Sequence, residues 1–97
     1  MIEQSGASLC VTVPMLIANA SSLLDAGRGC IKAAPRTGEV LFDLSAVGEA
    51  DSSALTVAFA WLRTARESGI TLRFSHPPAS MISLAELYGV SDFLPLA

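Results

Sequence analysis

The stretch Glu-Val-Leu-Phe-Asp-Leu-Ser at residues 39–45, followed by Asp-Ser-Ser-Ala-Leu at residues 51–55, decides how this chain folds. The run from Val40 to Leu44 is short and mostly apolar, with Asp43 as its lone charge, which is typical of a strand buried on both faces. Asp51 or Ser52 then offers a short side-chain oxygen that can accept hydrogen bonds from the unpaired amides of a first helical turn. The pattern therefore predicts a buried strand that leads to the polar start of a helix.

The predicted helix at residues 52–67 has a wide apolar side. On a helical wheel its apolar side chains cover an arc of about 200°, compared with the ~100° stripe of an ordinary surface helix. This arc holds Ala54, Leu55, Val57, Ala58, Phe59, Trp61, Leu62 and Ala65. The opposite arc holds Ser52, Ser53, Thr56, Ala60, Arg63, Thr64 and Glu67. The polar face is therefore narrow, and its N-terminal half consists only of small residues.

These small residues make a candidate docking face. Small side chains at Ser52, Thr56 and Ala60 would let another backbone or helix approach closely, although a plain solvated face has the same composition. Arg63 and Glu67 are four residues apart, which predicts a weak surface pair that contributes ~0.3 kcal/mol, and at an interface Arg63 would do more. Trp61 lies at the edge of the apolar arc and is interpreted as a core residue rather than an interface anchor.

Length and composition predict a single domain at residues 1–97, with neither nucleic acid nor an anionic membrane as partner. The chain is 52% hydrophobic and 15% charged, with a net charge of −3 and no cluster of Lys or Arg. Binding to phosphate backbones or to anionic lipid needs several cations close together. The high apolar content suggests instead a surface for a protein partner, and exposed apolar patches would favour weak self-association into a homodimer.

The sequence predicts no metal site and no cofactor. Cys10 and Cys30 lie in different predicted elements, and His76 is the only histidine, which we expect to be a loop residue. Two buried reduced thiols are the expectation for the cysteines, with a single disulfide as the alternative. No phosphate-binding glycine motif occurs, and the N-terminus resembles no signal peptide, so we expect a cytoplasmic chain that does not insert into the membrane.

Strand and helix patterns alternate along the chain. The predicted elements are strands at 8–13 and 15–18, a helix at 19–34 capped by Asn19, a turn at 35–38, the central strand at 40–44, the helix at 52–67, a strand at 70–74, a helix at 79–88 and a final turn within 90–97. The helical spacing at 79–88 includes Leu87 and Tyr88 among its apolar residues, and Phe93 and Leu94 are expected to pack back onto the core. Gly27 and Gly29 weaken the first helix, because each costs about 1 kcal/mol relative to Ala. This order predicts an α/β fold in which the later strands are parallel and joined by right-handed crossovers.

Three segments together resemble the STAS domain, the family of anti-sigma-factor antagonists and sulfate-transporter C-terminal domains. They are Phe-Asp-Leu-Ser at 42–45, Asp-Ser-Ser-Ala-Leu at 51–55 and Ala-Arg-Glu-Ser-Gly-Ile-Thr-Leu-Arg-Phe at 65–74. The resemblance covers the chain from about Leu9 onward. Ser-Leu-Ala-Glu-Leu-Tyr-Gly-Val at 83–90, followed by a Leu-Pro ending, is similar to the branch of small STAS subunits in Mla-type phospholipid-transport ABC systems of Gram-negative bacteria.

The resemblance implies a STAS-like mixed sheet with helices packed against it and a partner surface at the start of the helix that follows Asp51. In the antagonist branch the residue after this Asp is phosphorylated by a partner kinase, and Ser52 matches it. In the lipid-transport branch a hydroxyl residue at this place contacts the ATPase subunit. Ala54 and Thr56 stand where the antagonist pattern has glycine.

These observations predict a non-enzymatic subunit that binds the ABC ATPase of a phospholipid-transport complex, supports its assembly and activity, and so serves lipid asymmetry and maintenance of the outer membrane. It would lie peripherally on the inner membrane through that ATPase and its permease. The expected partner-binding residues are Asp51, Ser52, Ser53, Thr56, Ala60 and Arg63. The alternative is an anti-sigma-factor antagonist switched by phosphorylation of Ser52. A hydrolase with Ser52 as nucleophile is disfavoured, because the sequence indicates no base for it.

Overall fold

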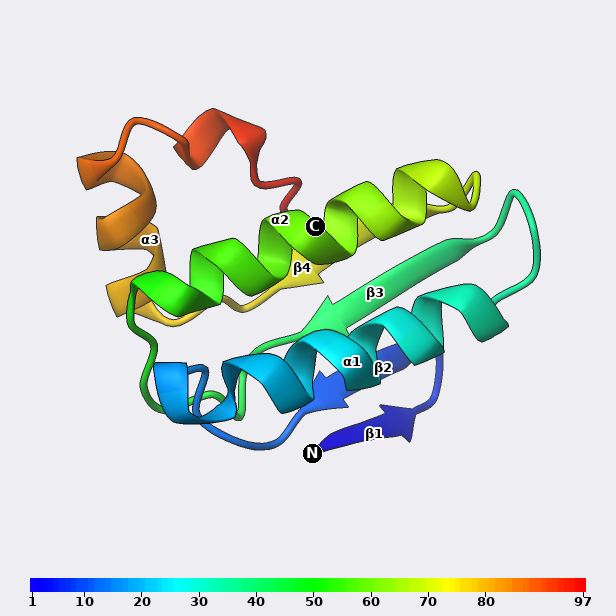
Figure 1. The fold of residues 1–97 in the computed structure, drawn as a ribbon, viewed down its shortest axis with the longest axis horizontal. Coiled ribbons are helices and arrows are strands. Elements are labelled where there is room, and N and C mark those ends of the chain that lie inside the picture. Colours follow the sequence, from blue (N-terminus) through cyan, green and yellow to red (C-terminus); the bar gives the residue numbers. More distant parts are fainter.

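A mixed four-stranded sheet and the helices α1 and α2 on one of its faces make up most of the fold (Figure 1). The computed structural model describes all of residues 1–97. Its elements are β1 (Ile2–Ser5), β2 (Ser8–Val11), α1 (Ile17–Ala33), β3 (Glu39–Asp43), α2 (Ser52–Glu67), β4 (Thr71–Ser75), α3 (Ala79–Leu87) and the short 3-10 helix η1 (Ser91–Phe93). No helix in this set combines the length and the apolar character that a membrane crossing requires.

The strands lie in the order β1-β2-β3-β4, so β3 is interior, as its apolar run predicts. β1 and β2 form an antiparallel hairpin, whereas the pairs β2–β3 and β3–β4 are parallel. The predicted parallel arrangement of the later strands and the α/β class are therefore confirmed. After η1 the chain returns to the free edge of β4, where Phe74 N donates to Pro95 O at 2.9 Å and Ala97 N donates to Phe74 O at 2.8 Å.

The predictions for the first twenty residues were partly wrong. β1 was missed, because the segment Ile-Glu-Gln-Ser is mostly polar and is held as a strand by its pairing with β2. The expected strand at 15–18 does not form: Met15 makes a single bridge to Ala50, and α1 begins at Ile17. Asn19 is not the cap of α1 but lies in its first turn, where its side-chain amide donates to Pro14 O at 2.8 Å.

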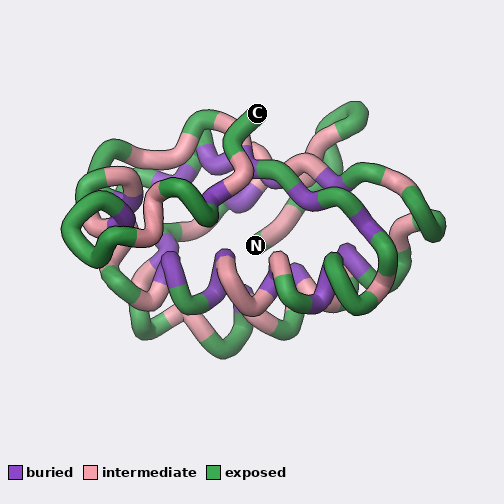
Figure 2. The backbone as a smooth tube through the Cα atoms, turned by 90° about the horizontal axis from the view of Figure 1, so that it is seen from above, coloured by how far each residue is buried: buried purple, intermediate pink, exposed green.

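The prediction that β3 is buried on both faces is also wrong. Val40 and Phe42 are buried against the helices, whereas Leu41 and Asp43 on the opposite face are only half-buried. Both α1 and α2 lie on the same side of the sheet (Figure 1), and buried segments gather where helices and strands face one another (Figure 2). No helix covers the outer face of the sheet, so charged side chains can lie there in solvent. Arg73 Nε and Glu39 Oε1 form an exposed ion pair on this face, with 3.8 Å between them.

Trp61 occupies the centre of the core, as predicted. Its ring is fully buried and stacks on Phe42 with centroids 4.4 Å apart and planes 16° from parallel. The indole N–H donates to Leu23 O at 3.2 Å, so the polar atom of this buried ring is satisfied by α1. The ring lies directly over Gly27, where an added Cβ would come within 2.1 Å of it. Gly27 therefore allows α1 and α2 to pack closely in spite of its cost inside a helix.

The wide apolar arc of α2 is confirmed, with six of its members buried and Phe59 and Leu62 half-buried. Thr64 was assigned to the polar arc but is buried, and its hydroxyl donates to Ala60 O at 3.1 Å. A hydroxyl that bonds within its own helix can be buried without an external partner. α2 ends at Glu67, and Gly69, which follows the cap residue Ser68, has a φ of 72° in the left-handed region, while Ile70 N donates to Ala65 O at 2.8 Å.

The C-terminal segment leaves apolar side chains exposed. Leu94 packs into the core as predicted, but Phe93 does not, since 69% of it is exposed. Leu87 and Tyr88, which the helical spacing at 79–88 grouped with the apolar residues, are 74% and 57% exposed. The side of the molecule formed by α3 and η1 therefore presents several apolar side chains to solvent.

Candidate functional site

One carboxylate caps the N-termini of both long helices. Asp51 Oδ1 accepts hydrogen bonds from the amide of Ser53, at 2.9 Å, and from the Ser53 hydroxyl, which is the expected cap of α2. Asp51 Oδ2 accepts from the amide of Ile17 at 2.9 Å. Ile17 is the first residue of α1, and Leu16 before it provides no side-chain cap. Asp51 thus supplies from 34 residues away the cap that α1 lacks.

Backbone hydrogen bonds hold the same two chain segments together. Met15 N donates to Glu49 O at 2.9 Å, and Asp51 N donates to Met15 O at 3.2 Å. The segments that enter α1 and α2 therefore run side by side, as Figure 1 shows for the connections that follow β2 and β3. The start of α2 is consequently fixed relative to α1 by backbone as well as side-chain contacts.

These contacts make the stability of the site depend on pH. The hydrogen bonds from the Ser53 hydroxyl and the Ile17 amide hold the pKa of Asp51 below its ordinary value. A carboxyl whose pKa is lower in the folded than in the unfolded state stabilises the fold above the unfolded pKa, and this contribution is lost as the pH falls through the folded pKa.

We expect Asp51→Asn to lower the free energy of unfolding at neutral pH, because the amide keeps one acceptor oxygen and loses the charge at two helix N-termini. Urea unfolding at a series of pH values should show the full difference from wild type at pH 7 and a shrinking one below about pH 4. Asp25→Asn is the control, because Asp25 is exposed on α1 and its side chain makes no hydrogen bond. Equal stability of wild type and Asp51→Asn at pH 7 would contradict the double cap.

The predicted partner-binding residues all lie at the start of α2 or along its outer side. Ser52, Thr56 and Arg63 are exposed, and the Ser52 hydroxyl forms no hydrogen bond within the chain. Ala60 is half-buried, and Ser53 is half-buried with its hydroxyl on Asp51. We call the exposed strip Ser52, Thr56 and Arg63, with Ala60 at its edge, the α2 face. The expected ion pair between Arg63 and Glu67 does not form, although both side chains are exposed.

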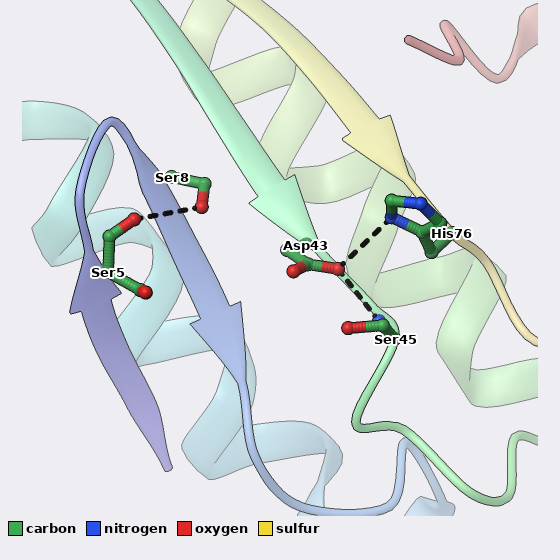
Figure 3. A network of polar contacts seen from close by, with 5 residues as sticks. All are labelled: Ser5, Ser8, Asp43, Ser45 and His76. Atoms are coloured by element: carbon green, nitrogen blue, oxygen red, sulfur yellow. Dashed lines mark hydrogen bonds and ion pairs between the residues drawn. The ribbon is translucent and has the colours of Figure 1, made fainter.

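Asp43 belongs to a second, separate polar cluster at the ends of β3 and β4 (Figure 3). Its Oδ1 accepts from Ser45 N at 2.9 Å and lies 3.5 Å from His76 Nδ1. The hydrogen bonds from Ser45 lower the pKa of Asp43, and His76 acts in the same direction. His76 is exposed in the loop after β4, as predicted, and has a φ of 52° in the left-handed region. The partners of Asp43 are thus Ser45 and His76, and it takes no part in the Asp51 turn.

Neither cysteine is bonded: Cys10 and Cys30 are free and half-buried. No three side chains among His, Cys, Asp and Glu are grouped so that they could hold a metal ion. The side chains available for contacts at the start of α2 are therefore hydrogen-bonding and apolar groups.

Two apolar features beside the α2 face were not predicted from the sequence. Ile17 is 75% exposed next to Asp51. On the other side of α2, a hollow of about 410 Å³ is lined by Phe59, Leu62, Arg63, Arg66, Val90 and Phe93. No local signal pointed to the contact between Asp51 and Ile17, because Asn19 was predicted to cap the helix and only the observed start at Ile17 shows that its first turn lacks a local cap. The hollow had no local signal either, because it forms only where the C-terminal segment passes α2.

Comparisons with known proteins agree with this architecture. The family model described as "Mlab, STAS domain" matches residues 3–96. A crystal structure from Thermotoga maritima, titled as a candidate anti-sigma factor antagonist, matches with a TM-score of 0.76 and 15% identity over 99% of this chain and 83% of that one. An anti-sigma-factor antagonist (STAS) domain protein from Planctomyces limnophilus matches with a TM-score of 0.76 and 10% identity over 99% and 86%. No curated protein matches. At such identities the two structures show the fold alone.

Proposed function

The chain belongs to the STAS domain family, in its MlaB-type branch, and from this premise we propose that it is a binding subunit of a phospholipid-transport complex. The complex's ABC ATPase would dock on the α2 face. The ATPase would bind ATP, and other subunits would bind the lipid. The chain itself would act without catalysis, by holding the ATPase in its assembled and active form, and would lie on the cytoplasmic side of the inner membrane through this contact.

The observation that carries the proposal is the geometry at the start of α2. Asp51 ties the first turns of α1 and α2 together, so the exposed residues Ser52 and Thr56 stand on a rigid base. A surface that is ordered before binding loses little conformational entropy when a partner docks. Its small side chains would allow the close approach of a helix from the ATPase.

The test is an affinity purification from native cytoplasm and detergent-solubilised membranes, with bound chains identified by mass spectrometry. We expect an ABC ATPase and a membrane permease to be recovered together, in stoichiometric amounts. Recovery of a soluble kinase in place of the transporter would contradict the proposal and support the second candidate function.

That second candidate is an anti-sigma-factor antagonist controlled by phosphorylation of Ser52. The observation in its favour is that Ser52 is exposed with a free hydroxyl at the first position of α2, in a fold shared with proteins of that description. A phosphate there would add up to two negative charges next to Asp51, on a surface now made of small groups. Intact-mass measurement after incubation with a cognate kinase would then show one phosphate on the wild type and none on Ser52→Ala.

A further inference from the structure

The hollow between α2 and the C-terminal segment combines apolar walls with positive charge. Phe59 and Leu62 of α2 form one wall, and Val90 and Phe93 form the other. Phe93 is 69% exposed, so a large apolar ring at the edge of the hollow is open to solvent. A second hollow of about 380 Å³ adjoins the first and shares Leu62, Arg66 and Phe93 with it. Together they make a groove along the side of α2.

Two arginines line this groove without partners. Arg63 and Arg66 are exposed, and neither guanidinium forms a hydrogen bond or an ion pair within the chain. Asp92 of η1 lines the second hollow and Glu67 follows Arg66 on α2, but neither carboxylate is paired with an arginine. The first hollow has no carboxylate in its lining, so Arg63 and Arg66 give it a local positive potential in a chain whose net charge is −3. This combination is complementary to a carboxylate that stands next to an apolar side chain.

The groove is continuous with the α2 face. Phe59 follows Thr56 by three residues and Arg63 follows it by seven, so all three lie on one side of the helix. A partner that covers Thr56 would therefore also reach Phe59 and Arg63. The hollow is open at the surface and half of its lining is exposed, which suits a projecting side chain better than a lipid chain that must bury most of its surface.

We infer that this groove receives an apolar side chain flanked by carboxylates, supplied by the ATPase subunit that docks on the α2 face. The inference rests on the proposed function and adds the chemistry of the partner to it. The apolar side chain fills the hollow between Phe59 and Phe93. The flanking carboxylates pair with Arg63 and Arg66, and the contact buries the exposed ring of Phe93.

The test measures the affinity of the purified ATPase subunit for single variants. Charge reversal in Arg63→Glu or Arg66→Glu is expected to weaken binding by ~30-fold or more, and Phe93→Ser by ~10-fold. Raising the salt concentration should weaken wild type more than the reversed variants. Lys32→Glu is the matched control, because Lys32 is exposed and unpaired on α1 and the charge change is the same. All four residues are exposed, and circular dichroism verifies that each variant is folded.

The outcomes separate this inference from the function on which it rests. If Arg66→Glu and Phe93→Ser bind like wild type while Thr56→Arg does not bind, the groove plays no part and the proposed function stands. If the ATPase binds neither wild type nor any variant, both fail. Two other results overturn the inference: a homodimer, seen by sedimentation, that Phe93→Ser dissociates, or a lipid, seen by native mass spectrometry, that Arg66→Glu releases.

Discussion

Replacing Thr56 with Arg is expected to abolish binding of the ABC ATPase that we propose as the partner, with a loss of affinity of ~100-fold or more. Thr56 is exposed in the middle of the α2 face, one helical turn after Ser52 and one before Ala60. A partner helix that fits against small side chains cannot approach as closely when a long charged side chain projects between them. The fold should be unaffected, because Arg has a higher helix propensity than Thr.

The measurement is isothermal titration of the purified ATPase subunit with wild type, Thr56→Arg and a control. Ser22→Arg is the control, because Ser22 is an exposed small polar residue on α1, away from the α2 face. Thr56→Arg is a sharper probe than Ala60→Arg, since Ala60 is half-buried and a large side chain there would also disturb packing. An affinity equal to that of Ser22→Arg would remove the α2 face from the binding surface.

The second large effect is expected from Gly27→Ala in the core. An added Cβ at this position would lie 2.1 Å from Cε2 and Nε1 of Trp61, a ring that is fully buried and stacked on Phe42. The ring has no space to retreat, so α1 and α2 would have to separate. Overpacking of this kind costs about 1–3 kcal/mol and occasionally more, and we expect the upper end of that range. The helix propensity of Ala offsets about 1 kcal/mol of the loss.

Gly29→Ala, in the same helix, serves as its control. A Cβ at Gly29 would meet nothing within 4 Å, so the substitution should gain helix propensity and stabilise the protein by roughly 0.5–1 kcal/mol. Denaturant unfolding of the two variants should therefore give changes of opposite sign. A Gly27→Ala protein as stable as wild type would contradict the tight packing of Trp61 on α1.

Local patterns were sufficient to predict the centre of the fold. The strand at 40–44 and the helix at 52–67 correspond to β3 at Glu39–Asp43 and α2 at Ser52–Glu67. These elements were predictable because their determinants are close in sequence: an apolar run, a capping Asp51, an apolar arc and a terminal Gly69. The burial of Trp61 and the candidate face with Ser52 and Thr56 followed from the same helical period.

Other features depend on contacts between segments that are distant in sequence. β1 is a strand only because β2 pairs with it, and Asp51 reaches Ile17 only because the two loops meet. Predicted interactions of Arg63 with Glu67 and of Phe93 with the core did not form, since pairing and burial are set by the neighbours that the fold provides.

By itself, then, the sequence determined the family, the α/β class, the central strand and helix, and the small-residue face at the start of α2, because periodicity and capping act within a few residues. The tertiary structure alone decided that one carboxylate serves two helices, that a glycine in α1 makes room for Trp61, and that an apolar groove with two free arginines adjoins the α2 face. Each of these arises from the packing of segments that are far apart in the chain, and no local pattern encodes which segments will meet.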